Sequence, residues 1–252
     1  MSAELLEVAL AAALPAGALL LERSRGPATG LSAKSSRTDL VSDADRAAEE
    51  LIARAILDAR PRDALVAEEG AAADGGSGVR WYVDPLDGTI NFLWGVPHWC
   101  VSVAAYDDEG GLVGVVHDPN RGETFTAARG AGARLDGRPI AVRPPPPLSE
   151  ALVATGFEYT AEARARQARL LTAVLPAVRD VRRFGAAALD LCWVAAGRFD
   201  GYFETGLKPW DRAAGEMIVR EAGGAVEDSA LDGVIAGHPA VVADLRGLVA
   251  GG

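Results

Sequence analysis

The sequence predicts an α/β protein whose first half is α+β and whose second half is α/β. Strand-like runs crowd the region between residues 64 and 142, whereas strand-like and helix-like segments alternate after residue 150. The proline run Pro144–Pro147 separates the two patterns, because consecutive prolines interrupt regular structure. We therefore expect two halves, an α+β metal-binding half over 1–143 and an α/β substrate-recognition half over 148–252, packed as one compact unit.

In the first half, two helices are expected to precede the strands. Apolar spacing predicts helices over about 3–23 and 43–59, and Ser42 and Asp45 are spaced as a capping box at the start of the second. A turn over 135–138 leads into the last strand. The expected strands are 64–67, 79–84, 100–106, 112–117, 123–127 and 140–142.

In the second half, the same signals predict alternating elements. The expected strands are 151–155, 181–184, 201–204, 224–227 and 234–236. The expected helices are 161–175, 186–196, 213–222 and 239–249.

Composition narrows the class of protein. The net charge of −10 argues against nucleic-acid binding, which requires a basic face. The apolar run 8–21 is preceded by Glu4 and Glu7 without a lysine or arginine, so it lacks the charge of a signal peptide and is too short to span a bilayer. Cys100 and Cys192 lie in apolar runs and are expected to be buried thiols in a reducing compartment. We expect a cytoplasmic protein that binds neither nucleic acid nor membrane.

The clearest candidates for catalytic residues are Asp84 and Asp87. These carboxylates end a strand-like run and are followed at once by Gly88, Thr89 and a new apolar segment. Carboxylates bind hard cations, and the N–H groups at a helix start bind anions. The combination favours metal-assisted phosphate chemistry.

The segment around Asp84 and Asp87 does not match two other known types of acidic loop. A calcium EF-hand counted from Asp84 would need acids at positions three and twelve, which are Leu86 and Gly95. The haloacid-dehalogenase phosphatases use two aspartates spaced by two residues, the first as a covalent nucleophile. The spacing of three in this chain speaks against a covalent aspartyl-phosphate.

Two further acidic sites could complete a metal centre. Glu68 and Glu69 follow a strand-like run, and Asp211 is expected to be the N-cap of a helix that begins with small residues. Each has an ordinary structural interpretation by itself, as a solvated turn and a helix cap.

With these motifs together, the chain resembles the inositol monophosphatase family of magnesium-dependent, lithium-sensitive phosphatases. The two family signatures correspond to residues 81–92 and to 210–215 with 221–224. Supporting matches are Lys34-Ser35-Ser36, residues 39–45, Glu68-Glu69 and residues 184–187. The resemblance implies the layered αβαβα sandwich of the inositol monophosphatase and fructose-1,6-bisphosphatase type, assembled as a homodimer.

The resemblance also implies a cofactor, two to three Mg²⁺ ions for which Mn²⁺ can substitute. Glu68, Asp84 and the carbonyl of Leu86 would hold the first ion. Asp84, Asp87 and Asp211 would hold the second, and Glu68 would assist a third through water. Mg²⁺ binds few carboxylates and keeps several waters, in agreement with this set.

The implied catalytic residues are Glu68, Thr89 and Asp45. Glu68 and Thr89 would hold a metal-activated water that attacks the phosphorus directly, and Asp45 would orient Thr89. The N–H groups of Gly88 and Thr89 would bind the phosphate. Asp45 also fits the capping box, and the two roles do not exclude each other.

The implied substrate is a small phosphorylated polyol or sugar such as inositol-1-phosphate. Its hydroxyls would meet Asp87, the backbone of Gly185–Ala187, Glu204 and Asp211. Fructose-1,6-bisphosphatase, histidinol-phosphatase and 3′(2′),5′-bisphosphate nucleotidase activities remain alternatives, as does a binding partner of the transcription or ribosome-maturation machinery. Arg182-Arg183 could meet a second phosphate, or form a solvated edge or a subunit contact.

Overall fold

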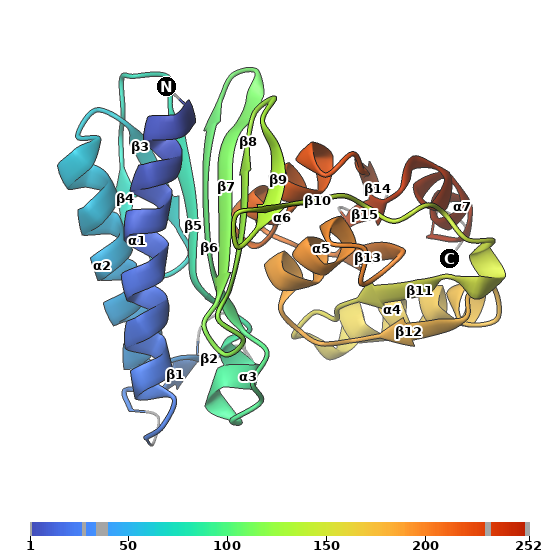
Figure 1. The fold of residues 1–252 in the computed structure, drawn as a ribbon. Coiled ribbons are helices and arrows are strands. Elements are labelled where there is room, and N and C mark those ends of the chain that lie inside the picture. Colours follow the sequence, from blue (N-terminus) through green and yellow to red (C-terminus); the bar gives the residue numbers. More distant parts are fainter. Residues whose placement is uncertain (1, 27–28, 34–39, 230–232, 250–252) are drawn as a thin grey trace.

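The protein is built from five layers. The computed structural model describes residues 2–26, 29–33, 40–229 and 233–249. Across the molecule, a pair of helices, an eight-stranded sheet, a second pair of helices, a five-stranded sheet and a third pair of helices follow one another (Figure 1). This arrangement is the layered αβαβα sandwich expected from the sequence.

The first layer consists of α1 (Ser2–Arg23) and α2 (Asp43–Ala59), which pack against each other on the eight-stranded sheet. Within the described residues, α1 is the one helix long and apolar enough to cross a membrane. It runs without interruption through Pro15 and exceeds the apolar run 8–21, so its length does not exclude a span. One side of α1, including Leu5 and Leu20, is fully buried against α2 and the sheet, as in a core helix.

The eight-stranded sheet has the order β10-β9-β8-β7-β6-β5-β3-β4. Its neighbouring strands are antiparallel, except that β3 and β5 are parallel. Strand β5 reaches Asp87, three residues beyond its predicted end. The strands are β3 (Ala64–Ala67), β4 (Ala72–Ala73), β5 (Arg80–Asp87), β6 (Cys100–Asp107), β7 (Gly110–Asp118), β8 (Glu123–Ala128), β9 (Gly132–Leu135) and β10 (Arg138–Ile140). A separate pair, β1 (Ser32–Ala33) and β2 (Leu40–Val41), was not predicted.

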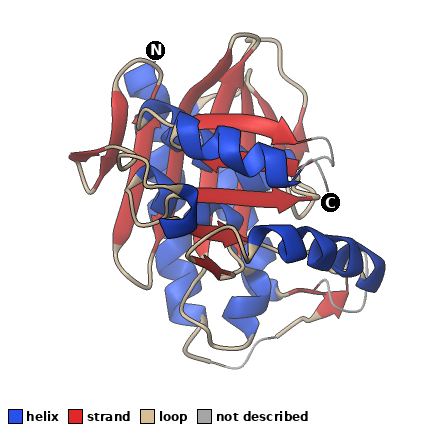
Figure 2. Ribbon diagram, turned by 90° about the vertical axis from the view of Figure 1, so that its right-hand side faces the viewer, coloured by secondary structure: helices blue, strands red, loops and turns tan. Residues whose placement is uncertain are grey.

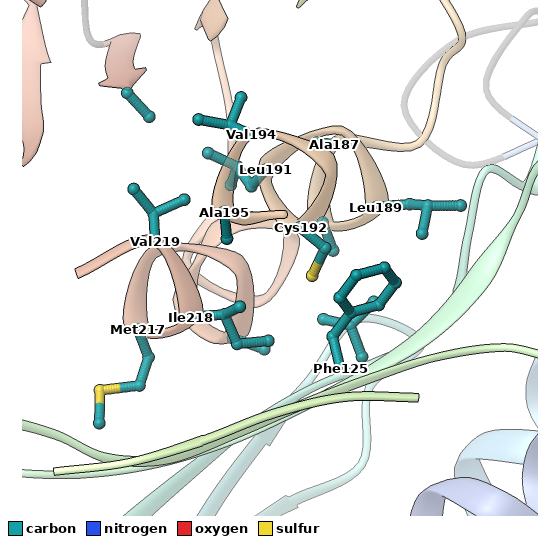
Figure 3. Packing of buried hydrophobic residues seen from close by; sticks show 14 of the residues in the cluster. Phe125, Ala187, Leu189, Leu191, Cys192, Val194, Ala195, Met217, Ile218 and Val219 are labelled. Atoms are coloured by element: carbon teal, nitrogen blue, oxygen red, sulfur yellow. The ribbon is translucent and has the colours of Figure 1, made fainter. Parts of the chain in front are cut away.

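The middle layer consists of α5 (Ala187–Ala195) and α6 (Pro209–Glu221), which come from the second half of the chain but pack on β5–β8. Figure 3 shows their apolar side chains meeting Phe125 of the sheet. Gly215 lets the two helices approach closely, because a Cβ there would lie 2.7 Å from Leu191. The small residues after Asp211 therefore serve the packing of α6.

The five-stranded sheet has the order β12-β11-β13-β15-β14. Figure 2 views the molecule from the side of α4 (Ala161–Val174) and α7 (Pro239–Val249), which cover the outer face of this sheet. The 3₁₀ turn Leu148–Glu150 follows the proline run. The strands are β11 (Leu152–Thr155), β12 (Asp180–Arg182), β13 (Gly201–Thr205), β14 (Ala225–Ser229) and β15 (Gly233–Gly237).

Candidate active site

A β-bulge at the end of β5 explains the spacing of the two aspartates. Asp84 pairs with Ser102 of β6, whereas Asp87 pairs with Cys100, so three steps along β5 match two along β6. In a regular strand, side chains three residues apart point to opposite faces. The extra residue restores the same face, and both carboxylates point toward α5 and α6. Pro85 lies within this segment, where it needs no ladder hydrogen bond.

The N-terminus of α5 holds the carboxylate of Asp87. The backbone N–H of Ala187 donates to Oδ1 at 3.2 Å, and that of Ala188 donates to Oδ2 at 2.7 Å. The Cys100 thiol donates to the same Oδ2 at 3.6 Å, a contact that the sequence did not suggest. Cys100 and Cys192 are both buried and free, as expected.

Gly88 forms the turn between β5 and the short helix α3 (Thr89–Leu93). Its φ of 93° lies in the left-handed region, which glycine adopts without strain. A Cβ at this position would lie 3.1 Å from both the His98 carbonyl oxygen and the Trp99 Cβ, and 3.3 Å from Ala186. The turn therefore requires glycine both for its backbone conformation and for its close packing.

Thr89 is held from behind by Asp45. The Thr89 hydroxyl lies 3.1 Å from Asp45 Oδ1 and 3.1 Å from the carbonyl oxygen of Leu86. The other carboxylate oxygen of Asp45 accepts from the backbone N–H of Ser42 at 2.9 Å and from its hydroxyl. Asp45 therefore makes both contacts that the sequence left open, the capping box and the bond to Thr89.

Asp211 is not the N-cap predicted from the sequence. Helix α6 begins at Pro209, and Asp211 is its third residue. Proline at the first helical position has the φ that a helix needs and lacks only an N–H that would be unpaired, so the helix starts earlier than expected. Asp211 still caps the helix, because its Oδ2 accepts from the Lys208 N–H at 2.6 Å.

Glu204 lies on β13 on the same side as Tyr202, and the two side chains are hydrogen-bonded. Burial raises the pKa of Glu204 to about 8, although the bond from Tyr202 acts in the opposite direction. Gly156 makes room for this side chain, because a Cβ there would lie 2.0 Å from Glu204 Oε2.

A single cavity of about 370 Å³ brings most of the predicted site residues together. Those that line it are Glu68, Asp84, Leu86, Asp87, Gly88, Thr89, Gly185, Ala187, Glu204 and Asp211. Asp45 does not line the cavity itself but contacts Thr89, which does. Residues 34–36 and 39, which contributed to the resemblance, lie outside the described residues.

The carboxylates of this cavity repel one another. Burial, followed by the charges of Glu68, Asp87 and Asp211, raises the pKa of Asp84 well above its ordinary value. The pKa values of Asp87 and Asp211 rise to about 7 and about 8, again chiefly through burial. Acidic oxygens under such repulsion are a suitable donor set for a hard divalent cation.

No ready-made metal cluster of three or more His, Cys, Asp or Glu side chains is present among the residues that the structure describes. Three of the carboxylates are instead held by backbone N–H groups: Asp84 by Leu86 at 3.0 Å, Asp87 by α5 and Asp211 by Lys208. The donor chemistry fits Mg²⁺, and these side chains would have to turn to bind it.

The rest of the cavity was not assigned from the sequence. It is lined by residues that no local pattern connects with Asp84, namely Phe157, Glu158, Tyr159, Thr160, Arg183, Thr205, Gly206, Leu207, Lys208 and Trp210. Of these, Arg183 carried a signal as half of the Arg182-Arg183 pair, and Trp210 as the first residue of the signature over 210–215. The others come together through the packing of β13, α6 and the segment after β11.

Comparison with known proteins identifies the family. The family model described as "Inositol monophosphatase family" matches residues 1–251. The chain belongs to the inositol monophosphatase family. It is 42% identical over 228 residues to Nus factor SuhB of Vibrio cholerae, covering 90% of this chain and 85% of that protein. It is also 40% identical to Nus factor SuhB of Escherichia coli, covering 94% and 92% of the two chains.

Solved structures of family members have the same fold. The extragenic suppressor protein suhB from Bartonella henselae superimposes with a TM-score of 0.92 at 37% identity, covering 98% of this chain and 99% of that one. Inositol monophosphatase from Anabaena superimposes with a TM-score of 0.84 at 34% identity, covering 97% and 94% of the two chains. The layered αβαβα architecture is therefore the fold of this family.

Proposed function

We propose that this family member is a magnesium-dependent phosphomonoesterase that hydrolyses inositol-1-phosphate or a similar sugar phosphate. Family membership supports phosphatase chemistry. The observation that carries the proposal is the cavity in which four carboxylates, Glu68, Asp84, Asp87 and Asp211, meet the Gly88 turn. We further propose a lithium-sensitive, cytoplasmic homodimer, as the resemblance to the family implies.

The acidic residues would hold the metal. Glu68, Asp84 and the Leu86 carbonyl are proposed for the first Mg²⁺, and Asp84, Asp87 and Asp211 for the second, with Glu68 assisting a third. When bound, the ions would neutralise charge on the phosphoryl oxygens and lower the pKa of water. The mutual repulsion of the carboxylates supports this assignment.

The neighbouring residues would position water and phosphate. The Thr89 hydroxyl lies between two acceptors, Asp45 Oδ1 and the Leu86 carbonyl. When it donates to Asp45, its lone pairs would be left to accept from a water, and Glu68 would accept a proton from that water. The N–H groups of Gly88 and Thr89 would bind the phosphate. Because α3 has only five residues, local N–H donors would matter more than a helix dipole.

The other side of the cavity would bind the substrate hydroxyls. Glu204 and Asp211 supply carboxylate acceptors, and the Gly185–Ala187 backbone lies beside them. The Ala187 N–H already donates to Asp87. Ala187 would therefore not bind the substrate directly. It would instead hold the Asp87 carboxylate, which would accept a hydrogen bond from a substrate hydroxyl.

The first test replaces Asp84 by asparagine, which preserves its size and removes its charge. Phosphate release from inositol-1-phosphate should fall by roughly 1,000-fold, since metal stabilisation contributes several kcal/mol to such a reaction. Asp58→Asn, on the exposed side of α2, is the matched control and should retain activity. Full activity of Asp84→Asn at saturating Mg²⁺ would rule out the metal assignment, and a phosphoryl-enzyme trapped by acid quench would rule out direct attack by water.

A second candidate function is binding to the transcription machinery, because relatives at 40–42% identity carry the name Nus factor SuhB. The same variant separates the two roles. If Asp84→Asn captures transcription proteins as well as the parent protein does while releasing no phosphate, the binding role does not require catalysis. Equal absence of capture by both proteins would contradict this second role.

A further inference from the structure

Tyr202 and Glu204 lie two residues apart on β13, so their side chains share the face of the sheet that packs on the middle layer of helices. The Tyr202 ring is fully buried in the core that β13 forms with α5 and α6. Phe203, between them, is buried on the opposite face with side chains of α4 and α7. The alternation along the strand therefore places the hydroxyl of a core tyrosine beside a carboxylate that lines the cavity.

The Tyr202 hydroxyl donates a hydrogen bond to Oε2 of Glu204. Burial, followed by the charge of Glu204, raises the pKa of Tyr202 well above its ordinary value, so the tyrosine keeps its proton and remains the donor. The hydroxyl of a buried tyrosine needs a polar partner, and the packed ring cannot move away from the one it has. Tyr202 therefore presents a fixed donor to one oxygen of Glu204.

The backbone at Gly156 confines the same carboxylate from a second direction. A Cβ at this glycine would lie 2.0 Å from Oε2, 2.1 Å from Cδ and 2.1 Å from Oε1 of Glu204. The segment after β11 therefore packs directly against the carboxylate and leaves it no room to move to that side. Glu204 is held between the Tyr202 hydroxyl and the Gly156 backbone.

One oxygen of Glu204 is left for a ligand. Tyr202 engages Oε2, whereas Oε1 has no hydrogen-bond partner in the part of the chain that the structure describes. Burial raises the pKa of Glu204 to about 8, and the bond from Tyr202 is the largest effect that opposes this rise. The tyrosine therefore favours the ionised form of Glu204, which accepts hydrogen bonds and donates none. A hydroxyl is the group that such an oxygen would bind.

We propose that Tyr202 is a positioning residue for substrate recognition, which holds Glu204 so that its Oε1 accepts a hydrogen bond from a hydroxyl of the substrate alcohol. The proposal rests on the phosphatase function proposed above. Without the tyrosine hydroxyl, Oε2 would lose its partner, and the carboxylate would turn away from the position that suits the substrate. Because Tyr202 acts through Glu204, its effect should be confined to esters whose alcohol carries a further hydroxyl.

The test compares Tyr202→Phe with the parent protein on two monoesters, inositol-1-phosphate and phenyl phosphate, whose alcohol has no further hydroxyl. The variant should raise KM for inositol-1-phosphate by about 10-fold, the effect of weakening a hydrogen bond to a charged group, with kcat nearly unchanged. Both constants for phenyl phosphate should remain those of the parent. Tyr106→Phe is the matched control for both esters, because it removes a hydroxyl that donates to the Ala213 carbonyl at 2.9 Å, outside the cavity.

A double-mutant cycle tests whether Tyr202 acts through Glu204. Glu204→Ala should raise KM for inositol-1-phosphate, and adding Tyr202→Phe to that variant should have no further effect, since no carboxylate remains to be positioned. Circular dichroism and urea unfolding establish that each variant is folded.

Several results would overturn the proposal. If Tyr202→Phe changes both esters equally or neither, or keeps its full effect in the Glu204→Ala protein, the tyrosine has a structural role only, and the phosphatase function stays intact. If the parent protein hydrolyses neither ester at saturating Mg²⁺, the phosphatase function fails, and calorimetric binding of inositol-1-phosphate then decides. An affinity that Tyr202→Phe lowers only when Glu204 is present would support the positioning role. Equal affinities, or no binding by the parent, would refute it.

Discussion

His98 and Asp190 form a buried ionisable pair behind the loop that carries Gly185. Their side chains are 3% and 1% exposed, and His98 Nε2 lies 3.4 Å from Asp190 Oδ1 without a hydrogen bond on either side chain among the described residues. The His98 ring stacks on Phe184 at 4.8 Å. Burial lowers the pKa of His98 to about 4 and raises that of Asp190 well above its ordinary value. We therefore infer that both side chains are uncharged, although the distance alone would permit an ion pair.

The uncharged pair predicts a pH dependence of stability. The pKa of His98 is near 6.5 in the unfolded chain and about 4 in the fold, so the unfolded state binds its proton first and stability falls as pH decreases through that window. His98→Phe should lessen this loss by on the order of 2–3 kcal/mol, measured by urea unfolding between pH 7 and pH 4.5. The charge of Arg121 also lowers the pKa of His98, and that of Asp118 raises it, but both residues are present in the parent protein and in the variant.

Asp190 should have the opposite effect on the pH dependence of stability. Its raised pKa keeps the proton in the folded state, so its contribution to stability is present at low pH and is lost as pH rises above 3.8. Asp190→Asn should therefore leave the protein at least as stable at pH 7. His238→Gln, at a partly exposed histidine just before α7, is the control. A His98 pKa above 6.5 in an NMR titration would instead establish a charged pair.

At the scale of secondary structure, the turn from β5 into α3 depends on Gly88. Gly88→Ala meets both a positive φ and contacts at 3.1 Å, whereas Gly122→Ala meets a positive φ of 65° with no atom within 4 Å. We expect the Gly122 variant to lose about 1 kcal/mol and the Gly88 variant about 2–4 kcal/mol, together with a loss of activity. Urea unfolding of the two variants separates backbone strain from packing. Equal losses would show that packing around Gly88 contributes nothing.

Periodicity and capping signals predicted most elements to within two residues, including the Ser42 capping box. The errors occur where contacts with other elements determine the bounds of a helix or strand. The end of β5 depends on its bulge against β6, which no local pattern in Asp84–Asp87 reveals. The helix α6 was predicted over 213–222, with Asp211 as its N-cap because aspartate is a favoured cap, whereas Pro209 begins the helix. The two-residue strand β4 exists only through its pairing with β3.

At the scale of the whole molecule, the cavity gathers residues that are distant in the sequence. The site residues carried over from the family resemblance converge there, because signature motifs mark the ends of β3, β5 and β13 and the start of α6. Phe157, Arg183 and Lys208 could not be placed in the same way. Their positions depend on how the five-stranded sheet packs against the rest of the molecule, and no spacing in the sequence encodes that packing. The predicted division at residues 143 and 148 stays a prediction.

Metal binding should therefore stabilise the whole molecule, since the ions would offset repulsion among carboxylates drawn from separate elements. At 100 times the dissociation constant, Mg²⁺ should contribute about 2.7 kcal/mol, or a rise of roughly 5–10 °C in the thermal midpoint relative to EDTA. Na⁺ at matched ionic strength should not reproduce this shift. Asp84→Asn should lose most of it, whereas Asp58→Asn should retain it, because only Asp84 lies in the cavity. Identical midpoints in Mg²⁺ and EDTA would mean that Asp84, Asp87 and Asp211 hold protons instead of metal, and the raised pKa values of these three aspartates would then describe the resting protein.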